Sequence, residues 1–423
     1  MSAHEKLWQD LGLDTKLHHE LLQSIGRTFE RTVGSQRNRP ETMQYFDQVV
    51  HESHGGRVAE LVAGKAQGSK VVGTFCIYVP DEIVLALGMV PMPLCGGTNF
   101  SVPYAETMFP RDICPLVKST LGLAFSKTCP YGPIVDLEVG ETTCDAKKKT
   151  WDVVGDEDSF HVMELPQKKH ALDVQLWRQA VNEFRERLET LAGKKLESGP
   201  LAAAILVMNE KRQALQNLAE LRKHDPPPIS GLDALVVMQA ALNDEPVRFT
   251  RQVHRLNAEL ATRAARGISP FARSVRRVMV SGCPAVMGNW KLHSLIESSG
   301  AAIVHDESCT GARYFEHLVD EAATDLAGQV TAIADRYLKI NCACFTPNQE
   351  RIDGIVRKIR EYNVQGVVEY VLQTCHGYNL EALRVEAALK EINVPSLKVV
   401  TDYSEEDTGQ LRTRIEAFLE RMG

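Results

Sequence analysis

The chain has 423 residues, of which 44% are hydrophobic and 24% are charged, and its formal net charge is -7. This length is sufficient for two or three domains, each with its own core. The negative charge provides no large basic surface, so nucleic acid is not expected as a partner. No stretch reaches the roughly 18 apolar residues of a membrane helix, and residues 1–10 have no apolar signal-peptide core, so a cytoplasmic protein is expected.

Residues 1–68 have the periodicity of amphipathic helices. The apolar residues that recur near helical spacing are Leu7, Leu11, Leu17, Leu21, Leu22, Ile25, Phe46, Val49 and Val50. We expect this segment to form a helical cap that packs on the first of two lobes.

Residues 69–150 change to an alternation of strands and helices. Short β-branched and aliphatic runs predict strands, and proline or glycine marks the helix ends. The predicted strands are 71–77, 89–94 and 134–143, and the predicted helices are 80–88 and 114–123. This order is typical of parallel βαβ units.

Residues 151–275 read as mostly helical, and we expect them to form a scaffold between the lobes. The strand and helix alternation returns in residues 276–423, which predicts a second lobe. Its predicted strands are 277–281, 301–304, 366–372 and 397–400, with a long helix at 348–362. The expected fold class is therefore α/β, with two Rossmann-like lobes that contain parallel sheets.

The ten cysteines fall in two runs of five, at positions 76–144 and 283–375, one run in each predicted lobe. In a reducing compartment such thiols favour metal binding over a disulfide framework. Open α/β sheets bind ligands beyond the carboxyl ends of their strands, where Cys95, Cys144, Cys309 and Cys375 fall. We therefore predict one cleft, lined by thiolates from both lobes.

Two cysteines of the first lobe have distinctive neighbours. Pro115 at the first helical position would place Cys114 at the helix N-cap, where the helix dipole and Lys118 would favour a thiolate. Cys95 precedes two glycines, whose backbone could pass close to an inorganic ligand and donate N–H bonds to its sulfurs. Without metal, Cys114 would be a capping residue and the Cys95 segment a tight turn.

The other thiols have less distinctive surroundings. Cys144, Cys309 and Cys375 end strands, although a free cysteine at a sheet edge is commonly a small hydrophobe. Cys76 and Cys283 lie among apolar neighbours and are expected in the core. Cys129 precedes a proline and is a reserve ligand. His376 is a candidate proton or hydrogen-bond donor, although a lone histidine in a loop is more often merely solvated.

The motifs that the sequence lacks are also informative. It contains neither a phosphate-binding P-loop nor a G-x-G-x-x-G motif, so we expect another protein to bind any ATP that the chemistry uses. The single residue between Cys342 and Cys344 is too short for a zinc knuckle, and there is no second close pair with the zinc spacing. Zinc is therefore only a minor alternative.

Six segments together resemble the 2-hydroxyacyl-CoA dehydratase and benzoyl-CoA reductase superfamily, and most closely its double-cubane cluster proteins. The similarity extends over most of the chain. The segments are Leu94-Cys95-Gly96-Gly97-Thr98, Cys114-Pro115-Leu116-Val117-Lys118-Ser119, Gly140-Glu141-Thr142-Thr143-Cys144-Asp145, Glu307-Ser308-Cys309-Thr310-Gly311, Cys342-Ala343-Cys344-Phe345-Thr346-Pro347-Asn348 and Thr401-Asp402-Tyr403-Ser404.

The resemblance implies an iron–sulfur cofactor between the lobes. Ordinary dehydratase subunits hold one [4Fe-4S] cubane by three thiols, and the matching positions here are Cys114, Cys144 and Cys375. The surplus of cysteines favours a double-cubane [8Fe-9S] cluster with six thiol ligands. For its second cubane we expect Cys95, Cys309 and Cys344, with Cys129 and Cys342 in reserve.

The resemblance also implies a function. The chain would be the catalytic component of an ATP-dependent reductase, which receives low-potential electrons from a separate homodimeric iron–sulfur ATPase and reduces a small molecule. Homodimerisation of the chain itself is expected on the same ground. The alternatives are a 2-hydroxyacyl-CoA dehydratase subunit with a single [4Fe-4S] cluster, a non-catalytic electron carrier or iron–sulfur storage protein, and a zinc-structured scaffold.

Overall fold

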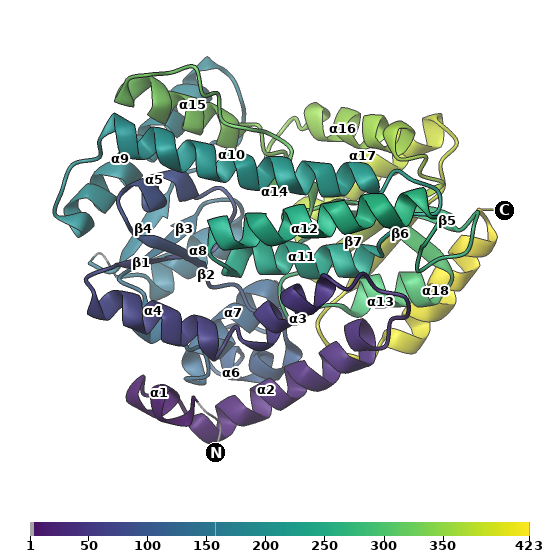
Figure 1. Cartoon of the computed structure of the whole chain (residues 1–423), viewed down its shortest axis with the longest axis horizontal. Coiled ribbons are helices and arrows are strands. Elements are labelled where there is room, and N and C mark those ends of the chain that lie inside the picture. The colour runs from purple at the N-terminus through teal and green to yellow at the C-terminus, as the bar shows by residue number, and fades with distance from the viewer. Residues whose placement is uncertain (1–3, 157, 423) are drawn as a thin grey trace.

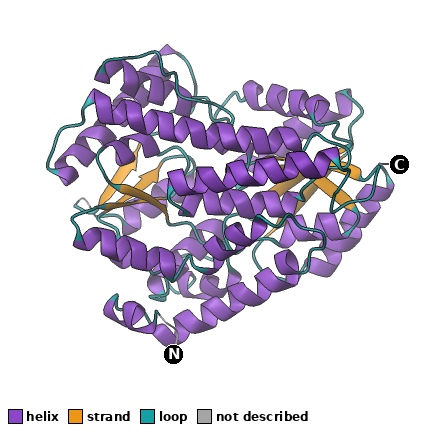
Figure 2. Ribbon diagram, viewed as in Figure 1, coloured by secondary structure: helices purple, strands orange, loops and turns teal. Residues whose placement is uncertain are grey.

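The computed structural model describes residues 4–156 and 158–422, and it contains two parallel four-stranded sheets (Figures 1 and 2). The order of the first sheet is β2-β1-β3-β4 and that of the second is β6-β5-β7-β8, so each strand of one has a counterpart in the other. The strands are β1 (Val71–Thr74), β2 (Val90–Pro93), β3 (Leu137–Glu141), β4 (Phe160–Met163), β5 (Arg276–Gly282), β6 (Ala301–Glu307), β7 (Gly366–Leu372) and β8 (Ser396–Thr401). The predicted α/β fold with two Rossmann-like lobes is confirmed.

Strands β1, β6 and β7 are buried along their whole length, and the central strands β3 and β5 are buried at all but one residue each, because helices cover both faces of each sheet. The first sheet extends beyond residue 150, the predicted end of the first lobe. Its edge strand β4 pairs in parallel with β3, and Phe160 packs on Trp151 with ring centres 5.3 Å apart. This strand has only four residues and follows a polar segment, so its pattern was too short to distinguish from the helices after it.

The N-terminal cap consists of α1 (Glu5–Asp10), α2 (Thr15–Phe29), α3 (Met43–His51) and α4 (Gly56–Ala66). The cap is helical, as predicted, but it contacts more than the first lobe. Phe29 packs edge-on against Trp290 of the second lobe at 5.3 Å, and Phe46 packs against Phe249 of the connecting segment at 5.9 Å. The cap therefore bridges both lobes.

Four long helices, α9 (Ala171–Ala192), α10 (Ser198–Leu221), α11 (Gly231–Asn243) and α12 (Pro246–Ala265), form the segment between the lobes, and α10 runs across both of them (Figure 1). The remaining α-helices of the described residues are α5 (Asp81–Ala86), α6 (Val102–Ala105), α7 (Pro115–Phe125), α8 (Asp145–Val154), α13 (Lys291–Ser298), α14 (Ala312–Phe315), α15 (Leu326–Leu338), α16 (Gln349–Glu361), α17 (His376–Glu391) and α18 (Thr408–Glu420). Within the described ranges, no helix is both long and apolar enough to span a membrane.

A buried ion pair joins the two lobes through this connecting segment. Glu82 of α5 and Arg212 of α10 are both inaccessible to solvent, and their charged atoms are 2.6 Å apart. The Tyr337 hydroxyl of α15 donates to the same carboxylate at 2.9 Å. These contacts fix the first lobe, α10 and the second lobe relative to one another.

Candidate functional site

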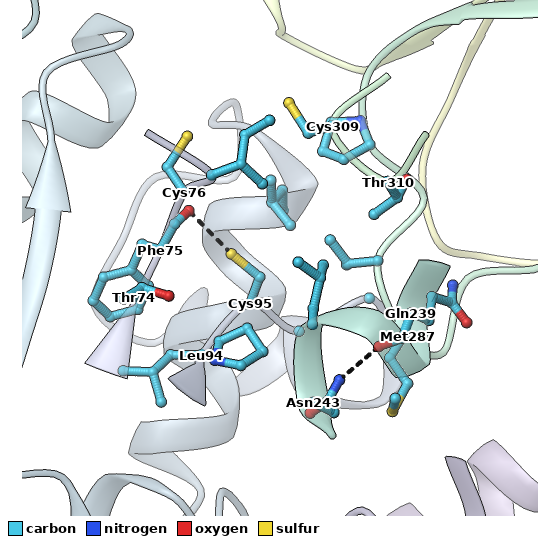
Figure 3. Close-up of a pocket in the computed structure, with 18 of the residues that line it drawn as sticks. Thr74, Phe75, Cys76, Leu94, Cys95, Gln239, Asn243, Met287, Cys309 and Thr310 are labelled. Carbon is cyan, nitrogen blue, oxygen red and sulfur yellow. Dashed lines mark hydrogen bonds between the residues drawn. The ribbon is translucent and has the colours of Figure 1, made fainter. Parts of the chain in front are cut away.

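One large cavity, of about 830 Å³, lies between the two lobes. Loops that follow strands of both sheets contribute to its wall, together with the cap and the connecting helices. Figure 3 shows Cys76 and Cys95 from the first lobe across from Cys309 of the second. The cysteines that line the cavity are Cys76, Cys95, Cys114, Cys129, Cys144, Cys283, Cys309, Cys342, Cys344 and Cys375, which are all ten of the chain.

Six of these thiols occupy equivalent places in the two lobes. They form three pairs, in which one cysteine follows a strand of the first sheet and the other follows the corresponding strand of the second sheet. The pairs are Cys76 and Cys283 after β1 and β5, Cys95 and Cys309 after β2 and β6, and Cys144 and Cys375 after β3 and β7. This pseudo-symmetry brings the carboxyl ends of both sheets to the same cavity.

Cys114, Cys144 and Cys375 form one group, and each is the N-cap of a helix, α7, α8 and α17 respectively. The N-cap placement of Cys114 with Pro115 after it agrees with the prediction. Burial, followed by the proximity of Cys375, raises the pKa of Cys114 to about 12. The pKa of Cys375 is lowered, mainly by a hydrogen bond with the buried Cys283. The helix N-termini would stabilise thiolates here.

Cys309, Cys342 and Cys344 form a second group in the other lobe, with Cys76 close to them. A hydrogen bond from Cys344 lowers the pKa of Cys342 to about 5, and the same contact raises that of Cys344. Burial raises the pKa of Cys309 to about 11, with Cys342 nearby adding to the shift. Burial also raises the pKa of Cys76, which Cys309 and Cys342 increase further. Cys76 was expected in the core but is partly exposed.

Cys95 and Cys129 stand apart from these two groups. Cys95 donates to the Phe75 carbonyl at 3.3 Å (Figure 3), and burial raises its pKa to about 11. Burial also raises the pKa of Cys129, and within the described residues no other thiol contributes to that shift.

The glycines after Cys95 line the cavity and also make contacts that were not predicted. The Gly96 N–H donates to the Thr120 hydroxyl at 3.1 Å rather than facing the cavity. A Cβ atom on Gly97 would lie 2.7 Å from the Met287 carbonyl of the second lobe. Close packing between the lobes therefore requires this glycine.

A buried lysine lies among the thiols. Lys147, in the first turn of α8, donates to the Phe75 carbonyl at 2.8 Å and to the Glu141 carboxylate, which is inaccessible to solvent. Burial opposes its charge, but Glu141, Cys76 and Cys95 raise the pKa of Lys147 overall. Lys147 was not among the predicted site residues, although its position three residues after Cys144 was a usable signal.

A second buried cation, Arg313, lies in the second lobe. Arg313 donates to Glu307 at 2.7 Å and to the Tyr378 hydroxyl, and its guanidinium approaches the Cys309 sulfur at 4.0 Å. Tyr378 in turn contacts the Cys342 sulfur at 3.5 Å. The predicted cation Lys118 is instead committed to Glu106 at 2.9 Å.

These features suit an anionic, multi-atom inorganic group better than a single ion. Among residues 4–156 and 158–422, no three His, Cys, Asp or Glu side chains are placed to hold one metal ion. The thiols surround a cavity instead, and Lys147 and Arg313 supply positive charge beside them. His376 is exposed at the first position of α17, on the rim of the cavity.

Several known proteins resemble this chain over most of its length. It is 36% identical over 366 residues to YjiM of Escherichia coli strain K12, provisionally named a dehydratase subunit, a match that covers 85% of this chain and 93% of that protein. It is 26% identical to the beta subunit of (R)-2-hydroxyglutaryl-CoA dehydratase from Acidaminococcus fermentans, covering 86% and 95%. It is 27% identical to one of the subunits of benzoyl-CoA reductase from Thauera aromatica, covering 81% and 87%.

These relatives include both dehydratase and reductase subunits, and the matches cover most of each chain. Residues 76–422 match the model of one protein family, the D-component of 2-hydroxyglutaryl-CoA dehydratase. That range includes every cysteine of the cavity and all strands of both lobes except β1. The chain belongs to the 2-hydroxyglutaryl-CoA dehydratase D-component family, within the superfamily of 2-hydroxyacyl-CoA dehydratases and benzoyl-CoA reductases.

Proposed function

We propose that this chain is the catalytic subunit of an ATP-dependent, low-potential reductase that holds a double-cubane [8Fe-9S] cluster and reduces a small molecule. The observation that carries the proposal is the convergence of ten thiols from two lobes on one cavity. A single cubane in this family would use three of them. The surplus lies mainly in the second group, where Cys342 and Cys344 share a hydrogen bond.

Cys114, Cys144 and Cys375 would hold one cubane, since all three are helix N-caps that face the same cavity. Cys95, Cys309 and Cys344 would hold the other. Cys342 lies close enough to Cys344 to replace it, whereas Cys129 is the weaker reserve because it is separated from the other thiols.

The residues around the thiols would adapt the site to electron transfer. A bound iron–sulfur cluster supplies low-potential electrons one at a time. Lys147 and Arg313 lie closer to the thiols than Lys118 does and would raise the affinity of an anionic group for an added electron, although their partners Glu141 and Glu307 offset part of this charge. The Tyr378 hydroxyl, next to the Cys342 sulfur, has the same effect if it donates to that sulfur.

The electron donor would be a separate homodimeric iron–sulfur ATPase, since the sequence has no phosphate-binding loop of its own. A homodimer of this chain and a cytoplasmic location are part of the proposal. His376, on the exposed rim of the cavity, is a candidate proton donor.

The second candidate function is that of a 2-hydroxyacyl-CoA dehydratase subunit with a single [4Fe-4S] cluster. The names of the relatives favour it, because two of the three are dehydratase subunits. In that case only Cys114, Cys144 and Cys375 would bind iron, and a different partner subunit would complete the active site.

Metal analysis of protein purified without oxygen distinguishes these functions. The double-cubane proposal predicts about eight irons per chain and reduction of small molecules when the ATPase, ATP and a reductant are supplied. About four irons would instead support the dehydratase. A full cluster without turnover of any acceptor would indicate an electron carrier, and a colourless zinc protein would overturn all three.

A further inference from the structure

We propose that Lys211, supported by Asp81 and Tyr314, is the proton donor to a small polar substrate in the cavity, in place of the exposed His376 on its rim. This inference rests on the proposed reductase function and assigns the group that completes its chemistry. The three residues come from the helices α10, α5 and α14, and all three line the same cavity as the thiols.

The lysine is held in a defined position. Its side chain is 4% exposed, and its ammonium donates to the Ala241 carbonyl at 2.6 Å. The same nitrogen lies 5.2 Å from the ring centre of Tyr314 and 5.4 Å from that of Phe249. One short hydrogen bond and two aromatic faces leave N–H groups of the ammonium for a ligand.

Tyr314 provides an independent indication of a ligand-binding site. The residue is 4% exposed, and its hydroxyl is buried without a hydrogen-bond partner among the described residues. An unpaired buried hydroxyl is unfavourable, so such a group usually has a partner. A polar substrate that accepts or donates a hydrogen bond here would remove that cost.

The burial of Lys211 favours proton release near neutral pH. Burial lowers the pKa of Lys211 to about 8, with Asp81, Asp244 and Glu245 opposing the shift and Arg212 adding to it. Burial raises the pKa of Asp81 to about 6, an effect that Lys211 and the nearby arginines Arg212 and Arg336 oppose and Glu82 reinforces. A lysine with this pKa is charged at pH 7 and gives up its proton more readily than an exposed one.

The chemistry balances for a two-electron reduction. With hydroxylamine as the simplest probe, the reaction is NH2OH + 2 e- + 2 H+ to NH3 + H2O, in which the N–O bond breaks. Both electrons come from the ATP-driven iron–sulfur donor. One proton leaves Lys211 as its N–H bond breaks and a new bond to the substrate forms, the second comes from water, and the neutral amine then regains a proton from water.

The test compares Lys211→Met with Lys149→Met, a control at a side chain that is 72% exposed. Ammonia formation from hydroxylamine is followed without oxygen, with ATPase and reductant, from pH 6 to 9, and reactions without ATP are subtracted. We expect turnover by Lys211→Met to be about 100-fold lower than that of the wild type. Wild-type turnover should decline as pH rises through about 8, and this decline should be absent in Lys211→Met. Its iron content and its rate of reduction by the ATPase should stay unchanged.

Turnover of Lys211→Met within twofold of the wild type would overturn this inference but leave the reductase function intact. Absence of turnover in the wild type would instead count against the proposed function. A second measurement does not require turnover, namely NMR titration of protein labelled with [ε-13C]lysine, with the Lys211 signal assigned by its loss in Lys211→Met. That signal should titrate near pH 8 and move when hydroxylamine is added, whereas a signal that titrates above pH 10 or ignores the probe overturns the inference.

Discussion

The buried pair Glu82 and Arg212 makes the clearest prediction about how the lobes are held together. Both side chains are 0% exposed, and their charged atoms are 2.6 Å apart. Replacing Arg212 by leucine would leave the Glu82 carboxylate buried without its main partner. Such losses cost roughly 3–5 kcal/mol, and we expect about 3 kcal/mol because Arg336 remains close enough to offset part of the charge.

The loss of stability in Arg212→Leu should depend on pH. In the wild type, burial raises the pKa of Glu82, but Arg212 and Arg336 hold it below its ordinary value, so its contribution is present above about pH 4.3 and lost in acid. In Arg212→Leu the pKa would rise above the unfolded value, so the variant would lose stability as pH rises. The penalty should therefore be about 1–2 kcal/mol smaller at pH 5 than at pH 8.

Urea unfolding of the metal-free protein, followed by circular dichroism, measures these free energies. The matched control is the double variant Glu82→Gln/Arg212→Leu, which removes both charges and should cost only about 1 kcal/mol at either pH. Equal stability of the single and double variants at pH 8 would refute the reasoning.

Other contacts in the structure make three further predictions. His54 is half-buried, and burial lowers its pKa to about 3, so its own contribution to stability should fall by about 1.4 kcal/mol per pH unit below pH 6.5. His54→Phe should therefore make the loss of stability in acid less steep in urea titrations, and parallel slopes for variant and wild type would contradict this. Gly97→Ala places a Cβ 2.7 Å from the Met287 carbonyl and should lower the free energy of unfolding by about 1–3 kcal/mol. The control Gly132→Ala, with open space around it, should leave this free energy unchanged, and equal urea midpoints of the two variants would refute the close approach of the lobes. Tyr378→Phe removes the hydroxyl 3.5 Å from the sulfur of Cys342, the reserve for Cys344. With Cys342 as a cluster ligand, the cluster potential should become about 40 mV more negative in an EPR-monitored redox titration, and an unchanged potential would exclude Cys342 as a ligand that accepts from Tyr378.

Much of the fold was predictable because local patterns determine it. Runs such as Gly366–Leu372 form buried central strands with the bounds that their apolar residues predict. Proline at position 115 predicted the helix start and thereby the place of Cys114. The cysteines after corresponding strands then had to meet at one edge, since parallel strands end on the same side of a sheet.

The rest depends on contacts that sequence spacing does not encode. Lys147 and Arg313 resemble ordinary surface residues in the sequence, and only packing buries them beside the thiols. Gly97 could be read as flexible next to a ligand, but its real neighbour, Met287, is 190 positions away in the chain. The cap helix α2 reaches Trp290 for the same reason, which the amphipathic pattern alone does not reveal.

The proposed chemistry depends most on thiols from both lobes binding one iron–sulfur group. Iron and sulfide content of protein purified without oxygen tests this directly when Cys114, Cys144 and Cys375 are each changed to serine, with Cys129→Ser as the control. We expect about eight irons in the wild type and the control, and a clear loss of iron and sulfide in each of the other three. Full iron and sulfide in Cys114→Ser, Cys144→Ser or Cys375→Ser would contradict the central claim.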